Sequence, residues 1–300
     1  MSTPLLIVVG GPTASGKTSL ALDLARHFRS EILSADSRQF YRELNIGTAK
    51  PTTAELQEIK HYFINTHSIQ ERYSAGQYGT DAFQVLLDRF QVHPVMILCG
   101  GSGLYIQALL KGFDDLPEVP ATLRERLSDD FSEKGLSWLQ AEVERRDPAF
   151  FARAEVQNPR RLLRALELLE VSGKTMADLR QQKARQLPFR VVSLGLNPGR
   201  EVLAERIDHR TEHMVAAGLF EEARQVMQWR SHQALQTVGY EEPFGYFDGQ
   251  WSKEEAIEKI KINTRQYAKR QMTWFRKYGE MQWISGSKAE ALKAIEENIS

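Results

Sequence analysis

Short apolar runs alternate with segments of helical pattern along much of this chain. Four runs are rich in valine, isoleucine and leucine, which favours buried β-strands, and two of them are followed directly by apolar residues at helical spacing. Strands that alternate with helices are typical of a parallel sheet covered by helices, so the pattern predicts an α/β core. The predicted strands are residues 5–9, 32–33, 95–98 and 191–196, and the helices that follow the first and third are residues 20–28 and 104–110.

The pattern changes between Gly112 and Leu187, where helical spacing continues without a convincing strand. Helices are predicted at residues 136–146 and 160–170, and the sheet resumes only at residue 191. We therefore expect a catalytic core formed by residues 1–112 and 191–300, with an all-helical insertion at residues 113–190. Two long helices, at residues 200–229 and 253–278, are expected to complete the core.

The composition of the chain indicates the class of protein. The chain is 42% hydrophobic and 26% charged, which is ordinary for a globular protein. Its apolar runs fall short of the roughly 18 residues that a membrane-spanning helix needs, and the first strand begins too early for a signal peptide, so we expect a cytoplasmic protein without a membrane partner. The single cysteine, Cys99, excludes an internal disulfide and a multi-cysteine zinc site.

A phosphate-binding loop follows the first predicted strand. Its two glycines let backbone N–H groups converge on an anion, and the helix that follows directs its positive end toward the same place. Lys17 adds a full positive charge, and the Thr18 hydroxyl is suited to Mg²⁺. The expected phosphate ligands are Gly11, Pro12, Thr13, Ala14, Ser15, Gly16, Lys17 and Thr18.

Asp36 follows the second predicted strand, so it should face the same crevice at the carboxyl edge of the sheet. There it could bind magnesium or act as a general base, although an aspartate in this position could also cap a turn or helix. Arg38 and Gln39 beside it suggest a polar recognition edge.

A third loop, Gly100-Gly101-Ser102-Gly103, follows the strand at 95–98. It would place the Ser102 hydroxyl near the reacting centre, although a plain glycine turn is an equal alternative. The strand before it does not end in the aspartate expected of many nucleotide hydrolases, which disfavours ordinary nucleoside triphosphate hydrolysis.

Charge is balanced overall, with 39 basic and 39 acidic residues, but its distribution is uneven. Residues 259–277 contain seven lysines and arginines and no acid. Lys261, Arg265, Lys269 and Arg276 recur at about one helical turn, which predicts a basic stripe exposed to phosphates, although a solvated charged face is the alternative. A second cluster, Arg160, Arg161 and Arg164, lies in the insertion, and two basic surfaces suit an extended polyanion.

The sequence resembles the tRNA dimethylallyltransferases, also called tRNA isopentenyltransferases, over nearly its whole length. The ordered set of motifs is far more specific than the phosphate loop alone. The motifs are GPTASGKT at 11–18, DSRQ at 36–39, GTAKP at 47–51, GGSGLY at 100–105, RALE at 164–167, VGY at 238–240, TRQYAKRQ at 264–271 and TWFR at 273–276.

The resemblance implies an α/β fold of the P-loop NTPase type, with a parallel sheet flanked by helices and an all-helical insertion that contacts the anticodon arm of tRNA. It implies transfer of a dimethylallyl group from dimethylallyl diphosphate to the N6 amine of adenosine 37 of tRNA, with Mg²⁺ as cofactor and Thr18 as its ligand. Catalytic roles are expected for Lys17, Asp36 and Ser102. A monomer of the bacterial type, without a zinc extension, is also expected.

Two groups of residues complete these expectations. In some relatives an arginine that contacts diphosphate occupies the position of Gln236, and glutamine cannot supply its charge, so Arg210 or Arg265 is expected to replace it unless lysine and magnesium suffice. The expected tRNA contacts are Asp36, Ser37, Arg38, Gln39, Ser102, Arg124, Arg160, Arg161, Leu162, Leu163, Arg164, Arg265, Lys269 and Arg270.

Three other functions remain open at this point. An adenylate isopentenyltransferase would use the same donor but needs no extended basic surface. A small-molecule or nucleoside kinase would bind ATP in the phosphate loop. An RNA-binding protein with the loop as a switch would leave Asp36 and Ser102 without a purpose.

Overall fold

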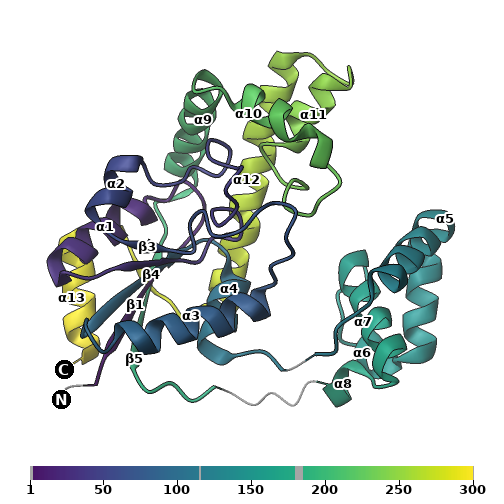
Figure 1. The fold of residues 1–300 in the computed structure, drawn as a ribbon, viewed down its shortest axis with the longest axis horizontal. Coiled ribbons are helices and arrows are strands. Elements are labelled where there is room, and N and C mark those ends of the chain that lie inside the picture. The colour runs from purple at the N-terminus through teal and green to yellow at the C-terminus, as the bar shows by residue number, and fades with distance from the viewer. Residues whose placement is uncertain (1–2, 115, 180–184, 300) are drawn as a thin grey trace. The chain divides into compact units, whose positions relative to one another are not determined.

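The computed structural model describes residues 3–114, 116–179 and 185–299, with only the backbone considered at residue 299 (Figure 1). Within these residues the larger unit contains a six-stranded parallel sheet with strand order β3-β2-β4-β1-β5-β6. The strands are β1 (Leu5–Gly10), β2 (Ile32–Ser34), β3 (His61–Tyr62), β4 (Val95–Gly100), β5 (Arg190–Leu196) and β6 (Gln282–Ile284).

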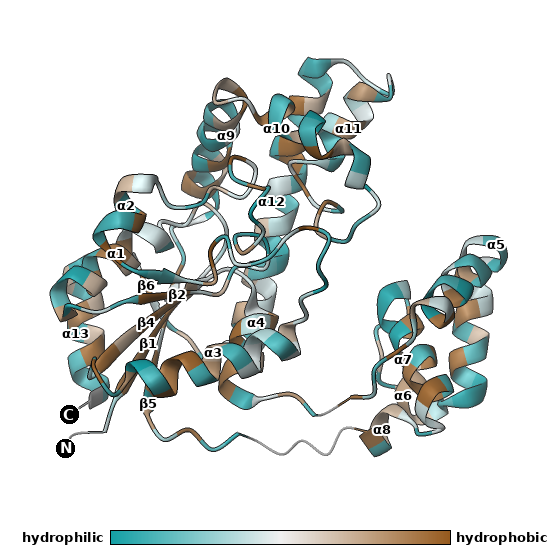
Figure 2. Cartoon of the chain, viewed as in Figure 1, coloured by the Kyte–Doolittle hydropathy of each residue, from teal (hydrophilic) through white to brown (hydrophobic). Residues whose placement is uncertain are grey.

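Both faces of the sheet are covered by helices, which explains why its central strand is apolar at every position before Gly10. Alternate residues of β1 enter different cores: Ile7 packs in the core that contains α1 and α13, whereas Val8 packs in the core that contains α3 and α4. Figure 2 shows the strands in brown between helices with hydrophilic outer faces. These helices are α1 (Lys17–Phe28), α3 (Ala75–Arg89), α4 (Gly103–Lys111) and α13 (Lys288–Ile299).

The larger unit contains further described helices. They are α2 (Thr53–Glu58), α9 (Arg200–Ala216), α10 (Leu219–Val226), the 3₁₀ helix η1 (Met227–Trp229), α11 (Glu241–Phe247) and α12 (Lys253–Tyr278). The basic segment is thus one continuous helix, α12, as the sequence predicts. It begins with a capping box between Ser252 and Glu255.

The four predicted strands are confirmed, but the prediction of one helix over residues 200–229 is wrong. α9 ends at Ala216 and α10 begins at Leu219, because Gly218 adopts a left-handed φ of 100° that an α-helix cannot contain. The two edge strands, β3 and β6, were not predicted, because they are short and, unlike the three buried residues of β2, form no continuous apolar run.

The smaller unit comprises Gly112–Arg185 and has its own apolar cores. Its described helices are α5 (Ala121–Arg146), α6 (Pro148–Phe151), α7 (Pro159–Ser172) and α8 (Met176–Leu179), and α5 is interrupted at Gly135, where φ is 76°. Sequence analysis placed the insertion at residues 113–190. In the structure, residues from Gln186 onward belong to the larger unit, where Phe189 is buried in the core beside β1.

Candidate active site

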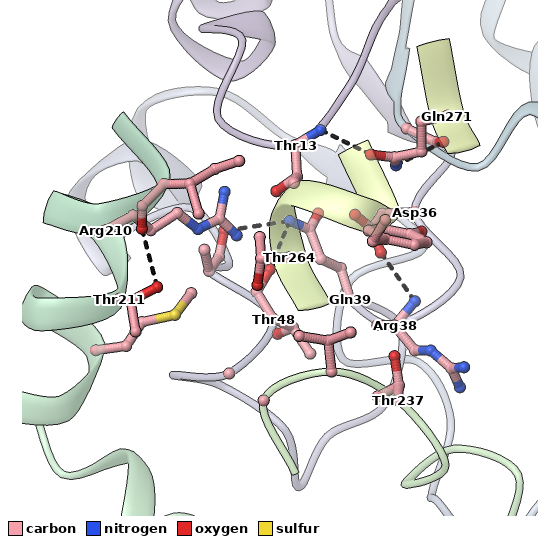
Figure 3. A pocket seen from close by; sticks show the side chains of 18 of the residues that line it. Thr13, Asp36, Arg38, Gln39, Thr48, Arg210, Thr211, Thr237, Thr264 and Gln271 are labelled. Atoms are coloured by element: carbon pink, nitrogen blue, oxygen red, sulfur yellow. Dashed lines mark hydrogen bonds between the residues drawn. The ribbon is translucent and has the colours of Figure 1, made fainter. Parts of the chain in front are cut away.

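One pocket collects the three loops that the sequence singled out. β1, β2 and β4 are neighbours in register, with Gly10 paired to Gly100 and Ser34 to Cys99, so their carboxyl ends lie at one level. The loops that follow these strands line the pocket together with α9, α12 and residues 237–240 (Figure 3). Such a crevice beyond the strand ends is where open α/β sheets bind ligands.

The phosphate loop has the geometry that its sequence predicts. Gly11 and Gly16 adopt φ values of 147° and 96°, and α1 begins directly afterwards at Lys17. The Lys17 ammonium lies in the pocket and donates to the Pro12 carbonyl oxygen at 2.7 Å. Burial lowers the pKa of Lys17 to about 8. A buried lysine of this kind is poised to gain an anionic partner.

Asp36 lies in the pocket and also caps a turn, so the structural alternative is confirmed and its role as a general base or metal ligand stays a prediction. Its Oδ1 accepts the Arg38 backbone N–H at 2.9 Å. Its Oδ2 makes no hydrogen bond to any described residue. Its charge acts on Lys17 and Arg210, which it favours in their protonated forms. The turn therefore orients a carboxylate that keeps one oxygen available.

Arg38 and Gln39 line the pocket, and part of their hydrogen-bonding capacity is used within the protein, so their role as a polar recognition edge stays a prediction. The Arg38 guanidinium donates to the carbonyl oxygens of residues 233 and 234 at 3.0 and 3.1 Å. Gln39 accepts from the Ser34 hydroxyl at 3.0 Å and donates to the carbonyl oxygens of residues 48 and 49. Both side chains hold rim loops in place.

Ser102 lies beside the Asp36 segment rather than in a plain turn. Its Oγ accepts the Ser37 backbone N–H at 2.9 Å and donates to Ser37 Oγ at 3.1 Å. The glycines around it are required by packing, since a Cβ at Gly103 would lie 2.0 Å from the ring of Trp274. Cys99 is the penultimate residue of β4, the strand before this loop, and burial raises its pKa to about 11, so it remains a thiol at neutral pH.

Helix α9 contributes a cation to the pocket. Arg210 lines the pocket close enough to lower the pKa of Lys17, and burial lowers its own pKa. Of the two cations considered as replacements at Gln236, Arg265 instead forms an ion pair with Asp208. Gln236 is exposed and donates to the Ser231 carbonyl oxygen at 3.2 Å, outside the pocket. No periodic signal on α9 distinguished Arg210 from its neighbours.

The predicted basic stripe on α12 is correct only in its second half. Lys261 lies 3.1 Å from both Glu212 and Glu258, and Arg265 is paired with Asp208, so both of these cations are neutralised. Asp208 and Glu212 of α9, together with Glu258 of α12 itself, supply this neutralisation. On α12 the exposed cations that pair with no carboxylate among the described residues are Lys259, Lys269, Arg270, Arg276 and Lys277.

The arginines of the smaller unit that were predicted to contact tRNA likewise divide into exposed residues and residues paired with a carboxylate. Arg160 and Arg161 are exposed, whereas Arg124 and Arg164 lie 3.8 and 3.0 Å from Glu167. Leu162, also predicted to contact tRNA, has 0% exposure in the core of this unit, which leaves only its backbone for such a contact. The neighbouring residue, Leu163, packs partly against the same core.

Glu222 of α10 holds one rim of the pocket. It is 8% exposed, and its carboxylate accepts the backbone N–H groups of Asn45, Ile46 and Gly47 at 2.8–3.0 Å. It also accepts the hydroxyl of Tyr240 at 2.7 Å. Because Gly47 and Tyr240 both line the pocket, this single carboxylate shapes its wall.

We expect Glu222→Gln to lower the free energy of unfolding by about 2–4 kcal/mol, because the amide NH₂ would face donors that now share charged acceptors. Chemical denaturation measures this change. Glu221→Gln, at an exposed position of the same helix, is the matched control and should stay within about 0.5 kcal/mol of the parent. Equal midpoints for the two variants would contradict the assignment.

Two features are absent from the described residues. They contain no group of three or more His, Cys, Asp or Glu side chains that could hold a metal ion. None of their helices combines the length and apolar character needed to cross a membrane.

Comparisons with known proteins agree with each other. A sequence model of the IPP transferase family matches residues 39–278. The tRNA dimethylallyltransferase of Cytophaga hutchinsonii is 46% identical over 279 residues, which cover 93% of this chain and 92% of the relative. The solved structure of a tRNA isopentenylpyrophosphate transferase from Bacillus halodurans is 32% identical with a TM-score of 0.69, covering 99% of this chain and 95% of that one. A eukaryotic dimethylallyltransferase acting on tRNA, 24% identical, shares the fold with a TM-score of 0.77 over 96% of this chain and 75% of its own.

Proposed function

This chain belongs to the IPP transferase family, the tRNA dimethylallyltransferases, and from that premise we propose the reaction that its pocket performs. It transfers a dimethylallyl group from dimethylallyl diphosphate to the N6 amine of adenosine 37 of tRNA, immediately 3′ of the anticodon, and releases diphosphate. The observation that supports this most directly is the meeting of Lys17, Arg210 and Asp36 in one pocket. Two cations suit a diphosphate, and one carboxylate suits an amine that must lose a proton.

Asp36 acts on the acceptor. The exocyclic amine of adenine is a weak nucleophile because its lone pair is delocalised into the ring. The free Oδ2 of Asp36 accepts a hydrogen bond from this amine and takes its proton as the nitrogen–carbon bond forms. Ser102, tied to Ser37, holds the neighbouring backbone and lies on the acceptor side. Reaching this pocket requires that the adenosine leave its stack.

Lys17, Arg210 and the loop N–H groups act on the leaving group. Negative charge grows on the diphosphate as the carbon–oxygen bond breaks, so these donors stabilise the transition state more than the ground state. The Thr18 hydroxyl lines the same pocket and would hold Mg²⁺ beside the diphosphate. Mg²⁺ would neutralise charge on the diphosphate.

Recognition of tRNA rests on the exposed cations of each unit. Lys269, Arg270 and Arg276 lie on α12 in the larger unit, and Arg160 and Arg161 lie at the start of α7 in the smaller one. Phosphate contacts of this kind position an RNA without reading its bases. This supports tRNA rather than free AMP as the acceptor. We place the reaction in the cytoplasm, carried out by a monomer.

The test offers labelled dimethylallyl diphosphate and Mg²⁺ in parallel to unmodified tRNA with an adenosine-rich anticodon loop, to the same tRNA with guanosine at position 37, and to AMP. Label is expected only in the first. Label in AMP would assign the chain to the cytokinin-forming enzymes. Label in the guanosine-containing tRNA would contradict the proposed acceptor atom.

Diphosphate binding should consume a proton above pH 8. Free Lys17 has a pKa of about 8, and a bound diphosphate raises this pKa because opposite charge favours the ammonium form. Affinity for inorganic pyrophosphate should therefore fall as the pH rises above 8, by up to about tenfold per unit. Calorimetry in buffers of different ionisation enthalpy measures the uptake, and Lys17→Met should abolish it. Equal uptake in the variant would exclude Lys17 as the group that titrates.

The exposed cations of α12 lead to a separate prediction for tRNA binding. Replacing Lys269 and Arg276 together with alanine should reduce the slope of log K against log salt by roughly 1.4–1.8, since each lost phosphate contact removes about 0.7–0.9. Lys261→Ala, at a cation already paired with two glutamates, is the control and should leave the slope unchanged. The opposite ranking would show that tRNA binding breaks the ion pairs of α12.

A further inference from the structure

The side chain of Gln271 joins two loops of the pocket that are distant in sequence. It lies on α12 and is 8% exposed. Its Oε1 accepts the backbone N–H of Thr13 at 2.8 Å, and its Nε2 donates to the carbonyl oxygen of Gly101 at 2.9 Å. Figure 3 shows the bond from Thr13 to Gln271. This is the only orientation of the amide in which both contacts are hydrogen bonds.

The link continues from Gly101 to both sides of Asp36. The Ser102 backbone N–H donates to the Ala35 carbonyl oxygen at 3.1 Å, and the Ser102 hydroxyl accepts from the Ser37 N–H. The approach of Gln271 is close, since a Cβ at Gly101 would lie 2.4 Å from Nε2. A continuous path of hydrogen bonds and peptide units therefore runs from the phosphate loop to the residues flanking the carboxylate.

We propose that Gln271 is a positioning residue that holds the phosphate loop and the Asp36 segment at the separation required for alkyl transfer. The inference rests on the proposed function, in which the donor occupies the first loop and the acceptor amine meets the second. Displacement at carbon needs nucleophile and leaving group in line, and an error near 1 Å can slow such a step about a hundredfold. Each loop alone keeps its own ligand contacts. The paired strands bring the two loops to one level, and the link through Gln271 holds the ends of the loops at a set distance.

The contact between Thr13 and Gln271 also predicts how loss of the Gln271 carboxamide affects binding of the diphosphate donor. In the free protein the Thr13 N–H is held by a side chain, so the loop has one donor fewer for phosphate. Removing the carboxamide frees that N–H. Donor binding is therefore expected to stay the same or tighten, whereas alkyl transfer slows. A residue that only supported the fold would weaken both.

Two variants test the proposal in full-length protein. Gln271→Met has a similar length and makes neither bond, so kcat should fall about 10- to 100-fold while KM for dimethylallyl diphosphate does not rise. Gln271→Glu keeps the bond from Thr13, but an ionised carboxylate repels the Gly101 carbonyl oxygen. Burial and that oxygen both favour the protonated acid, which donates to Gly101 and restores the link.

Rescue by pH separates positioning from general support of the fold. The kcat of Gln271→Glu relative to the parent should rise as pH falls, whereas the ratio for Gln271→Met should stay flat. A parallel loss of kcat and rise of KM in both variants, without recovery at low pH, would overturn the proposal. If Gln271→Met does not fold, the pH dependence of Gln271→Glu decides alone.

Two further measurements do not depend on prenyl transfer. Hydrogen exchange of the Thr13 amide in the free protein should accelerate in Gln271→Met, and inorganic pyrophosphate with Mg²⁺ should bind this variant at least as tightly as the parent. Weaker pyrophosphate binding would overturn the positioning role whatever the acceptor. An inactive parent protein with these two results as expected would instead disprove the proposed function and leave the link between the loops in place.

Discussion

Asp36→Asn is expected to lower kcat for prenyl transfer by about a hundredfold or more without weakening tRNA binding. A positioned general base contributes about 10²–10⁴ to rate, and the amide cannot take the proton of the attacking amine. The substitution does not remove the contact that holds the turn, because asparagine can still accept the Arg38 N–H that Asp36 Oδ1 accepts at 2.9 Å. The turn is therefore preserved while the base is removed.

Single-turnover transfer with saturating substrates measures this effect directly, since it excludes product release. Asp88→Asn is the control, because Asp88 is an exposed carboxylate on α3 outside the pocket, and its rate should equal that of the parent. Binding of tRNA should be the same in all three proteins. Full turnover by Asp36→Asn would remove this residue from proton transfer.

The second large effect is expected at Arg210. Arg210→Gln should lower kcat/KM for dimethylallyl diphosphate by about 10²–10³, the scale of one lost transition-state donor. Gln236→Ala should leave it unchanged, because Gln236 is exposed and bonds only to the backbone of Ser231 among the described residues. Comparing kcat/KM of these two variants identifies the position that supplies the second cation of the diphosphate site. Reversed effects would place that site at residue 236.

Arg210→Gln has a second readout that loss of fold would not produce. Arg210 lowers the pKa of Lys17, so its removal should raise that pKa from about 8. The proton taken up on pyrophosphate binding at pH 9 should then diminish, because more of Lys17 is already charged. Arg210→Lys keeps a charge without the planar fork and should recover part of the rate and all of the pKa effect.

The interrupted helix at residues 200–229 has a consequence for the site. The sequence favoured one helix, and the break at Gly218 instead lets α10 turn so that Glu222 reaches the loop at 45–47. A single left-handed glycine thus separates the helix that supplies Arg210 from the helix that holds the rim. The local pattern of apolar residues is nearly the same for either arrangement.

Sequence alone determined those features whose cause is local. The phosphate loop depends on glycines, a lysine and a hydroxyl within eight residues, and the position of Asp36 depends on its following a short apolar strand. Parallel strands end at one edge, so these segments could be assigned to one crevice before any coordinates were known. The helix at Lys253–Tyr278 was also predictable, since its periodicity and capping residues are local.

Tertiary structure decided which charges and amides are free. Lys261 and Arg265 have the same sequence character as Lys269, yet acids on α9, about 50 residues away, neutralise the first two. Arg38, Gln39 and Leu162 are likewise committed by distant or buried partners. Gln271 meets Thr13 across 258 residues. The sequence determines which chemical group a side chain carries. Whether that group remains available for a ligand depends on partners that only packing brings into contact.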